Sequence, residues 1–169
     1  SNGTDTGTYD IDVGATLQIE DGTRNWNPGI TVQGAGQVLV GSSTPTLNIN
    51  TDLTTATTFR HSQGNIDGTG SLTLNGLFDW NGGGFYTDGG LTTNANTTLD
   101  NNSQVHLWST WTNNGTVDWT DGDVYVRGGS HLLNAGTFNA AADDNNDEIA
   151  DSGLFTNAGT FNHDSSQDT

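Results

Sequence analysis

Residues 75–100 read NGLFDWNGGGFYTDGGLTTNANTTLD, and residues 114–139 read NGTVDWTDGDVYVRGGSHLLNAGTFN. Aligned without a gap, the two segments are identical at nine of 26 positions, including Asp79/Asp118 and Trp80/Trp119. A repeat at a fixed spacing of about 20 to 50 residues indicates a unit that stacks on its own copies, because one copy cannot bury its apolar face alone. The sequence therefore predicts a repeat architecture.

A shorter phrase, Asn-x-Gly-Thr followed by an apolar residue, divides this spacing further. It begins at Asn113, Asn134 and Asn157, which lie 21 and 23 residues apart. The segments between the phrases alternate apolar and polar residues, which is typical of short strands with one buried face. We expect an all-β fold, a single-stranded right-handed parallel β-helix (β-solenoid) with about eight rungs of roughly 20 residues.

The alternation also predicts which side chains point inward. Phe78 and Trp80 share one face of their strand, and Asp79 lies on the other. We expect the apolar residues to stack into interior columns, and the asparagine of each phrase to hydrogen-bond to its copies in a ladder. The glycines are expected to supply positive φ at the corners of the coil.

The chain is expected to form one domain over residues 1–169. We predict a polar N-terminal segment at 1–12, the rungs at 13–163 and a polar tail at 164–169. Leu, Ile, Val and Phe together make up 33 of the 169 residues, which is few for a globular core. A solenoid needs only a thin core, since each rung hydrogen-bonds to its neighbours along the backbone.

Charge excludes some classes of partner. The chain has 18 Asp, two Glu, three Arg and no Lys, with a formal net charge of −17. Nucleic-acid binding needs cationic side chains to neutralise phosphates, so we expect no nucleic-acid partner. No apolar run reaches the ~18 residues of a membrane span, so we expect no membrane insertion. The absence of cysteine excludes thiol catalysis and Cys-ligated metals.

The repeat resembles that of one family of proteins. The run from Gly70 to Gly76, the segment FDWNGG at 78–83, the pair Gly89-Gly90 and the phrase Asn-x-Gly-Thr-Phe resemble the parallel β-helix repeats of large bacterial surface and autotransporter-type adhesins. The resemblance covers most of residues 14–163. It implies a passenger or stalk region of an exported protein, with a role in adhesion or display at the cell surface.

The densest group of hard oxygen ligands lies near the C-terminus. Asp143, Asn145, Asp147, Ile149 and Asp151 stand at alternate positions, the spacing with which a calcium loop presents carboxylates and one backbone carbonyl. Leu154 stands where a calcium-binding EF-hand has a bidentate glutamate. We therefore keep two hypotheses, a Ca²⁺ site and a solvated acidic loop.

Aromatic residues supply a second candidate site. Trp108 and Trp111 are three residues apart, so in an extended strand they face opposite sides and one of them should be exposed. Beside Tyr86, Tyr125 and polar neighbours, such a ring would stack on a sugar. Interior packing of both tryptophans is the alternative.

The sequence bears on two further functions, ice binding and polysaccharide cleavage. Ranks of threonine on a solenoid face would bind ice, but the Thr-x-Thr pairs do not recur every 20 residues. Polysaccharide cleavage needs paired carboxylates, and Asp52 and Asp143 lie several rungs apart. The four histidines show no metal-ligand spacing and are expected at the surface or at rung edges.

We therefore expect a non-enzymatic, extracellular structural or adhesive β-solenoid, a segment of a larger surface protein or a stacking filament subunit. Its expected partners are cell-surface or matrix glycans, or further copies that associate end to end. A glycan-binding or ice-binding module is the alternative.

Overall fold

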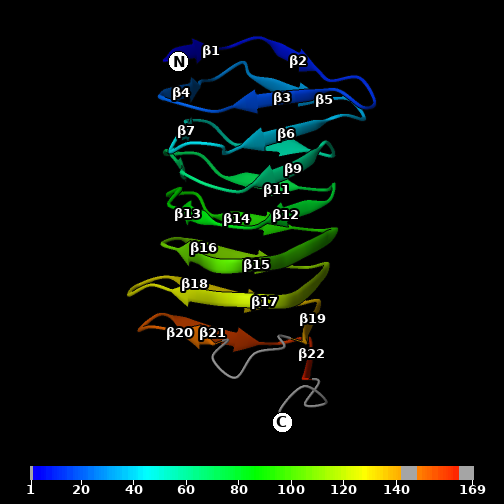
Figure 1. Cartoon of the computed structure of the whole chain (residues 1–169), viewed down its shortest axis with the longest axis vertical. Coiled ribbons are helices and arrows are strands. Elements are labelled where there is room, and N and C mark those ends of the chain that lie inside the picture. The colour runs from blue at the N-terminus through cyan, green and yellow to red at the C-terminus, as the bar shows by residue number, and fades with distance from the viewer. Residues whose placement is uncertain (1, 142–147, 164–169) are drawn as a thin grey trace.

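The computed structural model describes residues 2–141 and 148–163. These residues form an all-β parallel solenoid of about seven turns of roughly 21 residues each, and no helix is found among them. Figure 1 shows the turns stacked in chain order from the N-terminus to the C-terminus. The predicted fold class is confirmed, with slightly longer and fewer turns than the sequence suggested.

Each turn contributes one strand to each of three faces, and strands on the same face of successive turns pair in parallel. The first face contains β3 (Thr16–Ile19), β6 (Gln37–Val40), β9 (Thr58–His61), β12 (Phe78–Trp80), β19 (Thr137–Ala140) and β22 (Thr160–His163). The second face contains β1 (Gly3–Asp5), β4 (Thr23–Trp26), β7 (Thr46–Ile49), β10 (Asn65–Asp67), β13 (Gly83–Phe85) and β20 (Ile149–Ala150).

The third face lies between the end of each second-face strand and the start of the next first-face strand. It contains β8 (Leu53–Thr55), β11 (Leu72–Leu74), β14 (Leu91–Thr93), β16 (Thr110–Asn113), β18 (His131–Asn134) and β21 (Leu154–Asn157). The pair β2 (Thr8–Asp10) and β5 (Thr31–Gln33) occupies the same position in the first turns.

Two long strands join the first and second faces. β15 (Asn96–Leu107) and β17 (Thr116–Val126) each run from the first face around a corner into the second. Their register is irregular between Leu99 and Gln104, where the chain turns the corner. Because of these strands, the first and second faces form one continuous 14-stranded sheet.

Interior columns of apolar side chains hold the turns together. Strand pairing on the first face aligns one column of side chains, buried or half-buried except for the terminal Phe161, which is 37% exposed: Leu17, Val38, Phe59, Phe78, Thr97, Val117, Phe138 and Phe161. Phe138 and Phe161 stack with their ring centroids 5.5 Å apart. The 39-residue repeat therefore corresponds to two turns of the coil.

The repeated tryptophans each satisfy their polar atom at the corner that follows. Trp80 donates its indole N–H to the carbonyl of Gly82 at 3.1 Å, and Trp119 donates to the carbonyl of Gly122 at 2.7 Å. A buried indole needs such a partner. The acceptor is a backbone carbonyl in both turns, two residues after Trp80 and three residues after Trp119.

The asparagine ladder predicted for the Asn-x-Gly-Thr phrase is present. Asn113 donates to the amide oxygen of Asn134 at 2.8 Å, and Asn134 donates to that of Asn157 at 2.7 Å. Asn113 and Asn134 are fully buried, so these bonds satisfy amides that water does not reach.

The predicted positive φ is confirmed for glycines such as Gly90, Gly122 and Gly129, but it is wrong for the glycine of the phrase. None of Gly115, Gly136 and Gly159 has a positive φ. Instead, a Cβ at Gly136 would lie 2.1 Å from the carbonyl oxygen of Gly115 in the preceding turn, and the other two glycines make the same contact. Glycine is needed here because successive turns approach too closely to admit a side chain.

The N-terminal end of the coil is closed by a polar cluster. Arg24 occupies an interior position, aligned with Leu47 of the next turn, and its guanidinium pairs with Asp5 at 2.5 Å and with the hydroxyl of Tyr9 at 3.0 Å. Residues 1–12 were predicted as a segment preceding the rungs, but β1 and β2 pair with β4 and β5. The first turn therefore begins before position 13.

One histidine lies where none was expected. His61 is fully buried, stacks on Trp80 at 6.1 Å and contacts the carbonyl of Gly64 through Nε2 at 3.2 Å. Since a carbonyl only accepts, Nε2 carries the proton, and burial lowers the pKa of His61 to about 4. The expectation that every histidine would be at the surface or a rung edge is wrong for His61.

Candidate functional site

Outward-facing side chains of β15 and β17 gather on the second face. Strand pairing places Gln104 beside Asp123 and His106 beside Tyr125. Two residues further on, the backbone N–H of Trp108 donates to the carbonyl of Phe85 and that of Arg127 donates to the carbonyl of Leu107, so the ladder continues past the strand ends. We call the resulting group the aromatic patch: Tyr86, Gln104, His106, Trp108, Asp123, Tyr125, Arg127 and Asp151.

A stacked pair of rings forms one side of the aromatic patch. Tyr86 and Trp108 lie parallel, with 5.9 Å between centroids and 12° between planes. Trp108 is 49% exposed. The Tyr86 ring covers Gly84, where a Cβ would lie 2.4 Å from the ring. Glycine at position 84 therefore leaves room for the Tyr86 ring beside the half-exposed Trp108.

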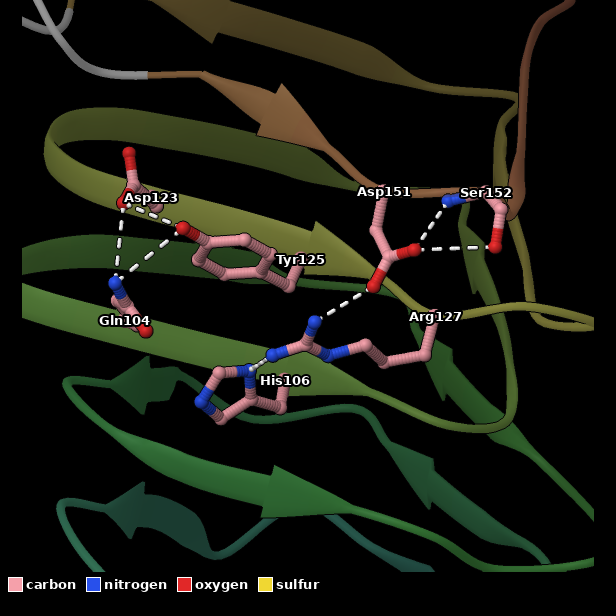
Figure 2. Close-up of polar contacts among 7 residues, drawn as sticks. All are labelled: Gln104, His106, Asp123, Tyr125, Arg127, Asp151 and Ser152. Carbon is pink, nitrogen blue, oxygen red and sulfur yellow. Dashed lines mark hydrogen bonds and ion pairs between the residues drawn. The ribbon is translucent and has the colours of Figure 1, made fainter.

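Arg127 organises the other side of the patch (Figure 2). Its Nη1 pairs with Asp151 at 2.6 Å, and its Nη2 donates to Nδ1 of His106 at 2.8 Å. The guanidinium also lies 4.4 Å from the centroid of the Tyr125 ring and 5.7 Å from that of Trp108. One cation thus fixes side chains from three successive turns of the coil.

The contact with Arg127 determines the state of His106. A guanidinium only donates, so Nδ1 must accept and the proton of the neutral ring resides on Nε2. Burial, followed by the charge of Arg127, lowers the pKa of His106 below its ordinary value. At neutral pH the ring therefore presents an N–H donor at Nε2, on the side away from Arg127 in Figure 2.

A second polar group completes the aromatic patch. The hydroxyl of Tyr125 donates to Asp123 at 3.2 Å, and the Gln104 amide lies 3.3 Å from that hydroxyl and 3.5 Å from the carboxylate. Partial burial and the adjacent Asp123 carboxylate raise the pKa of the Tyr125 phenol. The group offers an amide and a carboxylate within one hydrogen-bonded set (Figure 2).

Asp151 belongs to this patch through its ion pair. It accepts hydrogen bonds from the backbone and hydroxyl of Ser152 at 2.6 and 3.0 Å as well as from Arg127. These three bonds lower the pKa of the Asp151 carboxyl. The residue has a positive φ of 84°, which aspartate tolerates better than most side chains.

The structure separates the two tryptophans of the proposed stacking site. Trp111 is fully buried and donates its indole N–H to the hydroxyl of Thr93 at 3.0 Å. It therefore has no free face for a ligand and is removed from the candidate site. Tyr86, Trp108 and Tyr125, the other three candidates, lie together in the aromatic patch.

The proposed calcium ligands are only partly within the described residues. Asp143, Asn145 and Asp147 lie outside them. Ile149 begins β20 and aligns with the buried Val124, while the carboxylate of Asp151 is paired with Arg127. Among residues 2–141 and 148–163 no group of three or more acidic or histidine side chains is arranged to hold a metal ion.

Sequence reasoning missed His106, Gln104 and Arg127 as members of the site. Their signal was the period-two alternation of residues 104–108 and 123–127, which puts polar and aromatic side chains on the same outer face. Recognising it required knowing that β15 and β17 continue around a corner.

We compared the chain with protein-family models, curated proteins and solved structures, and no match was found in any of the three. In the part of the chain that the structure describes, no helix has the length and apolar character needed to cross a membrane.

Proposed function

We propose that this protein is a non-enzymatic adhesive β-solenoid that binds a neutral glycan through the aromatic patch. The observation that carries the proposal is the parallel pair of Tyr86 and Trp108, with Trp108 49% exposed beside fixed hydrogen-bonding groups. The rigid coil serves as the scaffold that holds these groups in place.

A sugar ring matches this combination of surfaces. Its C–H face packs on an aromatic ring, as the amphipathic Trp side chain favours. Its hydroxyls need both donors and acceptors, and His106 Nε2, the Gln104 amide and the Asp123 carboxylate provide them. Since all three are anchored by neighbouring side chains, little conformational entropy is lost on binding.

Electrostatics favour a neutral over an acidic glycan. The chain carries a net charge of −17, which repels an anionic ligand at long range. The cation of the patch, Arg127, already pairs with Asp151 and donates to His106. A uronate or sialate carboxylate would have to compete with Asp151 for the Arg127 guanidinium.

Binding is favoured over catalysis because the carboxylates of the patch are engaged. Asp151 is held ionised by Arg127, so it is unsuited to act as a general acid. Asp123 accepts hydrogen bonds from Tyr125 and Gln104. A glycosidase instead needs one carboxylic acid that is free to donate its proton.

The shape of the molecule and its repeated sequence support a role within a larger protein. A rod with a glycan site on its side suits a segment of a larger exported surface protein, as the resemblance to adhesin repeats suggests. End-to-end assembly of copies through strand edges is the competing role. Size-exclusion chromatography over a range of concentrations distinguishes them, because only assembly makes the apparent mass rise with concentration.

Titration calorimetry with cellohexaose and mannohexaose as neutral probes, and oligogalacturonate as the anionic probe, tests the proposal. We expect a neutral probe to bind, and Trp108→Ala to weaken its Kd at least about tenfold, equivalent to about 1.4 kcal/mol. The matched control is Leu77→Ala, which removes another exposed apolar side chain, 42% exposed. Binding of oligogalacturonate alone, or equal affinity in Trp108→Ala, would contradict the proposal.

A further inference from the structure

The third face of the coil carries an aligned column of threonines. Strand pairing places Thr54 of β8, Thr73 of β11, Thr92 of β14 and Thr112 of β16 side by side on four successive turns. They alternate with buried residues, so their side chains face outward. Thr156 of β21 resumes the column after Leu133 interrupts it in β18.

The Thr-x-Thr pairs of the sequence do not reveal this column, because its members are single threonines. Positions 54, 73, 92 and 112 are separated by 19, 19 and 20 residues. Single threonines at the length of one turn are enough to make a rank, since each strand of this face has one outward position. The Thr-x-Thr pairs do not follow the length of the turn, whereas these single outward threonines do.

A second column runs parallel to the first. Asn75, Asn94 and Asn114 each lie two positions after a threonine of the column, and all three are exposed. Asn94 donates to the amide oxygen of Asn75 at 2.8 Å, and Asn114 donates to that of Asn94 at 2.9 Å. We call the two columns together the Thr/Asn strip.

The Thr/Asn strip combines an absence of charge with side chains of fixed orientation. None of its seven residues is charged or aromatic, in a chain with a net charge of −17. Side-chain hydrogen bonds along the asparagines fix the orientation of the amides, and the β-branch of threonine restricts its rotamers. Within each column, the hydroxyl, methyl or amide groups of successive turns are therefore about 4.8 Å apart.

We propose that the Thr/Asn strip binds the surface of an ice crystal. A regular array of uncharged donors and acceptors matches a ligand that repeats at a similar spacing, and ordered water is such a ligand. The absence of charge within the strip leaves no group to select an ion. The absence of an aromatic ring removes the stacking surface on which a sugar would pack. This activity is independent of the glycan site, which lies on the second face.

The test measures ice recrystallisation inhibition and thermal hysteresis with the whole chain. We expect the wild type to be active, and Thr92→Tyr at the centre of the strip to lose most of that activity, because a bulky ring lifts the strip away from the ice. The matched control is Thr98→Tyr, the same replacement at an outward position of the first face, which should retain full activity. Melting temperatures of both variants establish that each is folded, and Thr73→Tyr replaces Thr92→Tyr if the latter is not.

Three outcomes would overturn the proposal: no ice activity in the wild type, equal activity in the strip variant and the control, or equal loss in both. Retention on microcrystalline cellulose that depends on Thr92, without ice activity, would instead make the strip a polysaccharide surface.

Discussion

The close approach of successive turns at the Asn-x-Gly-Thr phrase gives a sharp prediction for stability. In Gly136→Ala the new Cβ would lie 2.1 Å from the carbonyl oxygen of Gly115, whereas Cβ contacts in proteins begin near 3.0 Å. The two turns must therefore separate by about 0.9 Å at this corner. Two hydrogen bonds span the same gap, Gly136 N to Asn113 O and Thr137 N to Gly115 O, both 2.9 Å.

The cost follows from these two effects. Overpacking of this kind costs about 1 to 3 kcal/mol, and weakening a buried hydrogen bond costs about 1 kcal/mol, so we expect Gly136→Ala to lose about 2 to 4 kcal/mol of unfolding free energy. Urea-induced unfolding followed by far-UV circular dichroism measures this loss.

Two other glycines serve as controls for Gly136→Ala. A Cβ at Gly7 meets nothing within 4 Å and its φ is not positive, so Gly7→Ala should leave stability unchanged within about 0.5 kcal/mol or raise it slightly. Gly129 also has open space but a φ of 86°, so Gly129→Ala isolates backbone strain, about 1 to 2 kcal/mol. If Gly136→Ala is as stable as Gly7→Ala, the steric explanation for the repeated glycine is refuted.

Three further predictions concern other parts of the coil. Because the pKa of His61 falls from 6.5 to about 4 on folding, the unfolded chain binds the extra proton between these values, and stability should fall by about 3 kcal/mol as the pH drops through that window. Urea unfolding at pH 7 and pH 4.5 should show this loss in the wild type and a smaller one in His61→Leu. Asn134→Ala should cost about 2 to 4 kcal/mol in the same assay, because it removes a buried amide together with its hydrogen bonds to Asn113, Asn157 and the carbonyl of Thr160. Asn114→Ala in the exposed ladder should cost under about 1 kcal/mol, and equal losses would contradict the burial argument. Asp151→Asn should weaken glycan binding about three- to tenfold in calorimetry by releasing Arg127, with under about 1 kcal/mol lost in stability because the pair is partly exposed; unchanged affinity would remove Arg127 as the organiser of the patch.

Much of the architecture was predictable because stacked turns place equivalent residues at a fixed spacing in the sequence. Phe78, Trp80 and Asp79 alternate as the strand pattern requires, and the asparagine of each phrase forms its ladder. The glycine of the phrase was misjudged because the sequence records that a side chain is absent but not why. Glycine is favoured both where a side chain would clash with the neighbouring turn and where the backbone has a positive φ, so the sequence does not distinguish the two causes.

The site was less predictable for a geometric reason. The sequence identified Tyr86, Trp108 and Tyr125, but grouped them with Trp111, which packs into the core. Which of two tryptophans faces outward depends on where the chain turns a corner between them, and a period-two pattern does not extend through a corner. Arg127 and His106 lie in contact only because β15 and β17 belong to adjacent turns of the coil. Contacts of that kind depend on the pairing register of the strands and are not encoded in the local sequence.

The most direct test of the central claim uses the tryptophans themselves. Trp108 is 49% exposed, whereas Trp26, Trp80, Trp111 and Trp119 are 5% exposed or less. Titration of ¹⁵N-labelled protein with cellohexaose and mannohexaose should shift the indole signal of Trp108, assigned from Trp108→Phe, and leave the four buried indoles in place. A binding isotherm with Trp108 unmoved, or with the shifts confined to the other indoles, would contradict the assignment of the aromatic patch as the glycan site.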